Sequence, residues 1–599
     1  PIQDAVKYLK DSIAVTYGKK GDDVVAMNCD AVDQGITGLH EVAVPASWAD
    51  AVDAPAAETR EVPDYIRNFL EPVNRMEGDN IPVSGLLPVQ DGAYPTGTSA
   101  YEKRGVAIRV PHWDAEKCIQ CNQCSFVCPH GCIRPILTTP EETAAAPEGY
   151  VTKPANGAKE YQFRIAISPN DCTGCGNCVN VCPAKEKALD MRLLEQEQDE
   201  AARWDYVAAL PEKKNPFNKL TVKGSQFEKP LFEFSGACAG CGETPYIKLV
   251  TQLFGDRMMI ANSAGCAHVF SGSVPSAPYC KNEKGRGPAW NSSLFEDTGE
   301  FGLGMFLGTR QVQKEMASLA KKILELHASS ELDAALTDWL DNQMVSEGTR
   351  ERADRVIAAL EPVKESSELL TELYENKDYL PKRSQWLIGG DGWSYDIGYG
   401  GLDHALAAGE NINVLVLDTE VYSNTGGQAS KATPTAAIAK FAASGKRTKK
   451  KDLGRIFMTY GYIYVAQVCI GADKAQTLKA LAEAEAYPGP SIVIAYCPCI
   501  NHGIKTGMGL SQMEAKHAVD CGYWALYRYN PQLVGTGVNP FTLDSKEPTM
   551  SFREFLMNEV RYASLLKAFP DEAEGLLEKT EKDAMERLAY YKKLAAEKE

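Results

Sequence analysis

Two runs of cysteine constrain the possible folds of this chain more than any other feature of its sequence. Each run follows the pattern C-x₂-C-x₂-C-x₃-C-P, at residues 118–129 and 172–183. This is the bacterial spacing for [4Fe–4S] clusters, in which the fourth cysteine of each run ligates the other of two clusters. We therefore expect two clusters. One would be held by Cys118, Cys121, Cys124 and Cys182, and the other by Cys128, Cys172, Cys175 and Cys178.

Zinc is the alternative metal for closely spaced cysteines. It favours two Cys-x₂-Cys pairs that contribute two ligands each, whereas these runs contribute four cysteines and end in proline. The runs therefore indicate an α+β, bacterial-ferredoxin-like domain that transfers electrons. We expect the isolated cysteines to be small core side chains rather than ligands. They are Cys29, Cys132, Cys280, Cys469 and Cys521.

The bulk composition indicates a reducing, cytoplasmic setting. Eighteen cysteines in 599 residues, without an export signal at the start, argue for metal binding rather than disulfides. The net charge of −17 argues against nucleic-acid binding, and no apolar run approaches the roughly 18 residues that cross a bilayer. The basic run at residues 446–451 is interpreted as a solvated loop, with docking of an acidic partner as the alternative.

Apolar periodicity and turn residues divide the chain into four expected parts. They are the end of a preceding domain and a linker (1–40), the ferredoxin-like domain with long insertions (41–212), an α/β domain (213–540) and a helical tail (541–599). The first part should contain helices over 5–16 and 24–38, joined by a turn at 18–21. Residues 41–112 are rich in Pro and Gly, which predicts an extended connection with short strands.

Five short apolar runs alternate with helical stretches in the α/β part. They are residues 258–261, 385–390, 413–417, 464–468 and 491–495. Continuous apolar runs of this kind predict a doubly wound, mostly parallel sheet that is covered on both faces. The charged stretch 311–378 is expected to be an inserted helical pair, and two amphipathic helices should follow Ser551.

A third set of cysteines lies in the α/β part. Cys238 and Cys241 form another Cys-x₂-Cys pair, which is too few ligands for a cubane. Cys266 and either Cys497 or Cys499 are candidates for the remaining ligands. From spacing alone, structural zinc and simple burial remain alternatives.

A candidate diphosphate site follows two of the predicted strands. Gly390-Asp391-Gly392 comes directly after one strand, and a polar turn containing Asn424 follows the next. Glycines at a strand end let backbone amides approach a phosphate, and an aspartate there can hold the Mg²⁺ that bridges to it. This is the layout of a thiamine diphosphate (TPP) site.

Together these motifs resemble the pyruvate:ferredoxin (flavodoxin) oxidoreductase family, whose members combine TPP with three [4Fe–4S] clusters. The resemblance extends over nearly the whole chain. Besides the two cysteine runs, it rests on Thr16-Tyr-Gly-Lys-Lys-Gly, Val44-Pro-Ala-Ser-Trp, Cys238-Ala-Gly-Cys-Gly-Glu, Gly285-Arg-Gly-Pro-Ala-Trp-Asn-Ser-Ser-Leu-Phe-Glu-Asp297, Gly390-Asp-Gly-Trp, Tyr422-Ser-Asn-Thr-Gly-Gly-Gln and Asn539-Pro-Phe-Thr-Leu-Asp-Ser-Lys-Glu-Pro548.

The resemblance implies roles for individual residues. A proximal cluster beside TPP would be held by Cys238, Cys241, Cys266 and Cys499, where Cys497 replaces a serine of the family pattern. Mg²⁺ would be coordinated by Asp391, the Thr419 hydroxyl and the Val421 carbonyl. Contacts to TPP would come from Glu243, Cys266, Gly390, Asp391, Gly392, Trp393, Thr419 and Asn424. Asn424 would also face the reacting carbon, as the catalytic residue.

The resemblance also implies an activity and partners. The expected reaction is oxidative decarboxylation of pyruvate with coenzyme A to acetyl-CoA and CO₂, which reduces ferredoxin or flavodoxin. Single-chain members are about twice as long, so this chain is expected to be a C-terminal half that needs an N-terminal half for turnover, within a homodimeric enzyme. The alternatives are an oxidoreductase for another 2-oxoacid and a stand-alone electron-transfer module. Intact Asp391, Thr419 and Asn424 argue against the latter.

Overall fold

The computed structural model describes residues 2–18, 21–51, 61–273 and 276–597. Its N-terminal helices, α1 (Ile2–Tyr17) and α2 (Asp22–Thr37), match the two helices that the sequence predicts, and neither contains a buried residue. Lys19 and Lys20 of the expected turn, and Pro1, lie outside the described residues. Short strands are expected in residues 41–112, and within the described part of that segment only the start of β1 (Arg109–Trp113) is a strand. Before Arg109 the described part contains α3 (Glu71–Asn74), a π-helical turn (Ile66–Leu70) and 3₁₀ turns instead.

The ferredoxin-like domain is built from two small antiparallel sheets. Strand β1 (Arg109–Trp113) pairs with β5 (Leu189–Leu193), and β4 (Gln162–Ile167) lies between β2 (Ile133–Thr138) and β3 (Lys153–Pro154). Its helices are α4 (Gln123–Phe126), α5 (Pro140–Ala144), α6 (Asn177–Asn180) and α7 (Asp199–Ala208). Helices α4 and α6 occupy equivalent places in the two cysteine runs, so the duplication in sequence is also a duplication in structure.

The α/β domain contains an eight-stranded sheet in the order β13-β12-β10-β11-β9-β8-β6-β7. Its six strands from β10 to β7 are parallel, and β12 and β13 add antiparallel at one edge. The strands are β6 (Met258–Ser263), β7 (Ala289–Ser293), β8 (Ser384–Gly389), β9 (Asn413–Asp418), β10 (Tyr464–Val468), β11 (Ser491–Tyr496), β12 (Tyr527–Tyr529) and β13 (Phe541–Leu543). All five predicted strands are present.

Both faces of this sheet are covered, as a doubly wound fold requires. Alternate residues of β9 enter two different cores: Val414 and Val416 face one, and Leu415 and Leu417 face the other. The helices of this domain are α8 (Val222–Ser225), α9 (Thr244–Phe254), α10 (Cys266–His268), α15 (Tyr399–Ala407), α16 (Leu453–Met458), α17 (Lys474–Ala486) and α18 (Ser511–Asp520). Within the described ranges, no helix is both long and apolar enough to span a bilayer.

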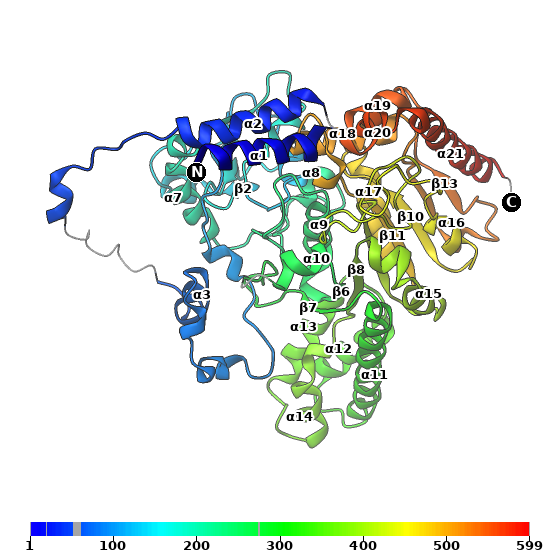
Figure 1. The fold of residues 1–599 in the computed structure, drawn as a ribbon. Helices are drawn as coiled ribbons and strands as arrows, with labels where there is room; N and C mark the ends of the chain where they lie inside the picture. Colours follow the sequence, from blue (N-terminus) through cyan, green and yellow to red (C-terminus); the bar gives the residue numbers. More distant parts are fainter. Residues whose placement is uncertain (1, 19–20, 52–60, 274–275, 598–599) are drawn as a thin grey trace.

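Two helical regions differ in detail from the expected ones. The insertion predicted as a pair comprises α11 (Thr298–Leu324), α12 (Ser330–Asn342), α13 (Thr349–Leu360) and α14 (Glu368–Glu375), with a core of their own. The first half of α11 packs on the sheet through Gly302 and Leu303, and α12 to α14 lie beyond the sheet (Figure 1). The tail contains α19 (Phe552–Asn558), α20 (Val560–Ala568) and α21 (Pro570–Ala596) rather than two helices. Residues after 540 also supply β13 and join the core of the sheet through Tyr562 and Tyr591.

Candidate cluster and diphosphate site

Four parallel strands place the predicted site residues along one edge of the large sheet. Cys266 follows β6, Asp391 follows β8, Thr419 follows β9 and Cys499 follows β11, and these strands are neighbours in the order β11-β9-β8-β6. In open α/β sheets, ligands bind at the carboxyl ends of the strands. Residues that are more than 200 positions apart in sequence therefore meet at one site because the strands are parallel.

The three oxygen atoms expected around Mg²⁺ lie together. Asp391 is 2% exposed, and its carboxylate accepts a hydrogen bond from the Thr419 amide at 3.2 Å. The Thr419 hydroxyl is 3.1 Å from the Val421 carbonyl oxygen, and Ser423 Oγ donates to the same hydroxyl at 2.6 Å. Burial, reinforced by Asp418, raises the pKa of Asp391 well above its usual range. A bound cation would stabilise this carboxylate, so the donor set fits a hard divalent ion.

A buried ion-pair network holds the turn that presents Thr419 and Val421. Glu420 lies between them with φ 64°, a left-handed conformation that costs free energy for a non-glycine residue. Its carboxylate pairs with Arg561 at 2.8 Å and with Lys450 at 3.3 Å. Burial acts to raise the pKa of Glu420, but Lys450 and Arg561 outweigh it and lower the pKa to about 2. Sequence reasoning missed this network because its members are far apart in the chain.

The basic run at 446–451 is not a solvated loop throughout, so that interpretation is corrected. Lys450 has a side chain only 11% exposed, and its ammonium lies 2.7 Å from Asp418. Lys446 donates to the Ser430 carbonyl. Lys449 pairs with Asp583 of α21 at 2.9 Å. The acidic partner of this run is therefore within the chain itself.

The third set of cysteines lies beside the turn that contains Thr419 and Val421. Gly242 donates its amide to the Pro498 carbonyl at 3.1 Å, and a Cβ atom at Gly242 would lie 2.6 Å from Pro498 backbone atoms. This close approach brings the Cys238–Cys241 loop against the segment that contains Cys499. The pKa of Cys266 is raised chiefly by burial and then by a neighbourhood that includes Glu243, Cys241, Cys499 and Cys238.

The structure distinguishes Cys499 from Cys497. Cys497 is fully buried, and its thiol donates to the Ala495 carbonyl at 3.3 Å. Cys499 is partly exposed, and its thiol donates to Ser423 Oγ at 3.4 Å. Ser423 in turn reaches Thr419, so Cys499 is joined to the expected magnesium ligands by two hydrogen bonds.

The remaining predicted TPP contacts lie at the same edge of the large sheet. Glu243, Gly392 and Trp393 are buried, whereas Asn424 is exposed. Glu243 is 5% exposed, and burial raises its pKa to about 8. Gly392 is tightly packed, because a Cβ atom there would lie 2.4 Å from the Tyr422 ring. Trp393 is fully buried within the core beneath Gly390–Gly392. Asn424, the predicted catalytic residue, lies exposed in the turn after β9.

Cysteines of the two runs lie close to one another in the structure. Cys128, Cys172, Cys175 and Cys178 line one small cavity. Cys182 lies among the neighbours that raise the pKa of Cys121 and Cys124, after burial as the main cause. Among the described residues, no three His, Cys, Asp or Glu side chains could surround a single metal ion. A cubane instead spaces its four thiolates around a cage.

The isolated cysteines behave as expected with one exception. Cys132, Cys280, Cys469 and Cys521 are buried. Cys29 lies on α2, which has no buried residue, so its prediction as a core side chain is wrong. Its helix has an apolar periodicity but contacts no core in the described structure.

One short segment connects the ferredoxin-like domain to the third set of cysteines. Asn180 of α6 donates to the Gly509 carbonyl at 2.7 Å, and Asn177 donates to Ser511 Oγ at 3.0 Å. Ser511 then donates to the carbonyl of Gly240, between Cys238 and Cys241, at 2.9 Å. The run that contains Cys175 therefore faces the third set of cysteines.

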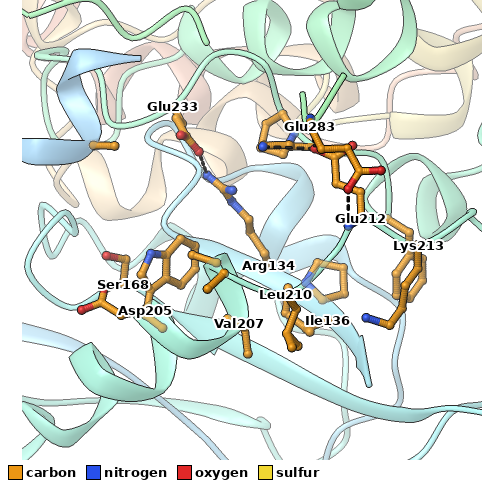
Figure 2. Close-up of a pocket in the computed structure, with 18 of the residues that line it drawn as sticks. Arg134, Ile136, Ser168, Asp205, Val207, Leu210, Glu212, Lys213, Glu233 and Glu283 are labelled. Carbon is orange, nitrogen blue, oxygen red and sulfur yellow. Dashed lines mark hydrogen bonds and ion pairs between the residues drawn. The ribbon is translucent and has the colours of Figure 1, made fainter. Parts of the chain in front are cut away.

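A cavity of about 880 Å³ lies elsewhere, beside β2 and α7 (Figure 2). It is lined by none of the predicted site residues. Its charged side chains are largely paired: Arg134 points to Glu233, Lys213 pairs with Glu142 at 2.9 Å, and Lys229 pairs with Glu212 at 3.1 Å. We assign it no part in the candidate site.

Three family models match this chain. Residues 117–186 match a 4Fe-4S dicluster domain, and residues 375–495 match the C-terminal TPP-binding domain of thiamine pyrophosphate enzymes. Residues 52–107 match a domain of unknown function. The predicted fold class, an α+β dicluster domain followed by an α/β TPP-binding domain, is confirmed, and so is the prediction of iron–sulfur clusters and TPP as cofactors.

Curated relatives match nearly the whole chain. It is 58% identical over 99% of its length to pyruvate-flavodoxin oxidoreductase of Klebsiella pneumoniae, and 58% identical over 99% to pyruvate:ferredoxin oxidoreductase of Moorella thermoacetica. It is 44% identical over 99% to the mitochondrial pyruvate dehydrogenase [NADP(+)] of Euglena gracilis. The chain spans 51% of the first two relatives and 33% of the third. The resemblance noted in the sequence is thereby confirmed.

Proposed function

We propose that this chain is the TPP-binding and electron-transfer part of an enzyme that oxidatively decarboxylates pyruvate with coenzyme A and reduces ferredoxin or flavodoxin. The observation that carries the proposal is the link from Cys499 through Ser423 to Thr419, with hydrogen bonds of 3.4 and 2.6 Å. This link supports a cluster ligand at Cys499 next to the proposed diphosphate site. Electrons released at the cofactor would then have a short path to the cluster.

Different residues of the chain would hold Mg²⁺, TPP and the third cluster at this site. Asp391, Thr419 and the Val421 carbonyl would hold Mg²⁺ and through it the diphosphate, with contacts from Glu243, the Cys266 backbone and Gly390–Trp393. When bound, TPP supplies an electron sink for decarboxylation of the 2-oxoacid. Asn424 would orient the reacting group. Cys238, Cys241, Cys266 and Cys499 would hold the third cluster.

The contacts between domains support an order for the clusters. Gly509 packs so closely on the Cys175 carbonyl that a Cβ atom would lie 2.4 Å from it, and the same segment binds Gly240. The cluster of Cys128, Cys172, Cys175 and Cys178 would therefore receive electrons from the third cluster. The cluster of Cys118, Cys121, Cys124 and Cys182 would pass them to the external acceptor.

The partners follow from the length of the relatives. Because the chain spans about half of the two oxidoreductases above, we propose that an N-terminal half, in the same or a separate polypeptide, completes the site for pyruvate and coenzyme A. The full enzyme would be a homodimer in the cytoplasm. This chain without that half should bind clusters and TPP but should not consume pyruvate.

Anaerobic turnover tests the proposal. The chain together with its N-terminal half should reduce ferredoxin or flavodoxin when pyruvate, coenzyme A, TPP and Mg²⁺ are all present, and omission of any one should abolish reduction. Parallel assays with 2-oxoglutarate and 2-oxobutyrate separate the pyruvate enzyme from one that acts on another 2-oxoacid. Faster reduction with either of these would overturn the substrate assignment. No reduction with any 2-oxoacid would leave only an electron-transfer module.

A further inference from the structure

Lys248 is a buried cation without an anionic partner in the described protein. It lies on α9, all of whose residues are buried, and the lysine itself is 1% exposed. Its ammonium donates a hydrogen bond to the Ser125 carbonyl, which is a neutral acceptor. Arg134, by contrast, is a partly buried cation nearby that pairs with Glu233, as Figure 2 shows. An unpaired buried ammonium is costly, so its presence calls for a compensating negative charge.

The cysteines of both runs supply the position of that charge. Ser125 lies within the first run, between Cys124 and Cys128, and α9 begins three residues after Cys241. Cys128 and Cys124, which belong to different predicted clusters, are both among the groups that act electrostatically on Lys248. Of the two, Cys128 acts more strongly. The lysine therefore reaches from the α/β domain into the region between the two clusters.

We propose that Lys248 is a positioning residue that raises the reduction potentials of the two clusters, with the larger effect on the cluster that contains Cys128. A cubane with four thiolates is anionic, and reduction adds one more negative charge. A fixed cation in a low-dielectric interior stabilises the reduced form more than the oxidised one. The inference rests on the cluster assignment of the proposed function, but not on the substrate.

Redox titration of the iron-loaded full chain tests this. Clusters are reduced stepwise with dithionite and mediators under anaerobic conditions, and their signals are followed by electron paramagnetic resonance. Lys248→Met should lower the midpoint potential of the Cys128 cluster by at least about 59 mV, a tenfold change in the one-electron equilibrium. The midpoint potential of the Cys124 cluster should fall by less. In Lys248→Arg both midpoint potentials should stay close to those of the parent chain.

Two further variants separate charge from packing. Lys117→Met removes a lysine next to Cys118 that is 42% exposed and paired with Asp114 at 3.0 Å, so its shift should be much smaller. Lys248→Gln gives a second neutral side chain. If Met and Gln variants lose iron while the Arg variant keeps it, the charge is required and the proposal stands.

Other outcomes overturn it. Unchanged potentials in iron-replete Lys248→Met would show that the charge of Lys248 does not act on the clusters. An equal shift in Lys117→Met would show that burial gives Lys248 no special effect on the potentials. Loss of iron from all three Lys248 variants would assign the residue to packing. A parent chain that binds no cluster would instead refute the cluster assignment of the proposed function, which iron analysis detects separately.

Discussion

The ammonium of Lys450 lies 2.7 Å from the carboxylate of Asp418, at the carboxyl end of strand β9, where Asp418 is fully buried. The hydroxyl of Tyr395 donates to the same carboxylate at 2.5 Å. The Lys450–Asp418 ion pair holds the basic segment 446–451 against the end of β9, where the turn that contains Thr419 and Val421 begins. Lys450, which lies in a run of basic residues in the sequence, thus helps to hold the candidate magnesium and diphosphate site in place.

Replacement of Lys450 should therefore destabilise the fold. Lys450→Met leaves Asp418 and Glu420 as buried carboxylates without that cation, which should cost about 3–5 kcal/mol in the free energy of unfolding. Urea denaturation followed by tryptophan fluorescence measures this loss. Lys449→Met is the matched control, because Lys449 is itself 58% exposed and pairs with Asp583 and with the exposed Glu586. Its cost should stay below about 1 kcal/mol, and equal costs for the two variants would contradict the role of the network.

Asp391 should control the retention of TPP. Asp391→Asn removes the only carboxylate proposed for Mg²⁺, so Mg²⁺-dependent binding of TPP should weaken by at least about 100-fold. Calorimetric titration with TPP in the presence and absence of Mg²⁺ measures this. Asp396→Asn, five residues further on, removes a carboxylate that pairs with Lys431 at 3.0 Å and should leave binding nearly unchanged. Unaltered binding by the Asp391 variant would place the magnesium site elsewhere.

The two neighbouring cysteines should differ in their effect on iron content. Three [4Fe–4S] clusters correspond to about 12 iron atoms per chain. Cys499→Ser should reduce the content to about 8 and remove one cluster signal in electron paramagnetic resonance. Cys497→Ser should keep about 12, because Cys497 is turned into the core. The reverse result would make Cys497 the ligand.

Glu514 should make stability depend on pH. It lies on α18 and accepts a hydrogen bond from Asn558 at 2.5 Å, and burial together with Glu559 raises its pKa from 4.5 to about 7. Because the folded state holds this proton more tightly than the unfolded state, stability should fall as pH rises from about 4.5 to 7 and stay reduced above that range.

The matching variant isolates this effect. Glu514→Gln cannot ionise, so it should be more stable than the parent by about 1–3 kcal/mol at pH 8, with a smaller difference at pH 5. Urea midpoints at the two pH values measure the change. Glu574→Gln, whose carboxylate is 61% exposed in a pair with Arg553, should show no such change. A parent whose stability rises from pH 5 to pH 8 relative to Glu514→Gln would contradict the prediction.

Local patterns in the sequence predicted five strands of the parallel sheet and the dicluster domain, and they proposed the cluster ligands. The spacing of cysteines predicts the two cluster runs, because cluster ligands must be close in the chain to close the cage cheaply. The five apolar runs predict the strands of a parallel sheet, because a strand that is buried on both faces has no polar positions. The glycines around Asp391 predict a phosphate site, because glycines at the end of a strand let backbone amides approach a phosphate. Family models match both the dicluster domain and the TPP-binding domain.

Only the tertiary structure decided which distant residues share a site. Parallel strands set Cys499 beside Thr419, and the hydrogen bonds of Ser423 separate Cys499 from its neighbour Cys497. The partners of Lys450 and the isolation of Lys248 have no signature in sequence, because ion pairs and burial depend on segments brought together by folding. Sequence spacing thus predicts the ligands of each cluster run and the dicluster domain that the family model matches, while packing determined the electrostatic environment around them.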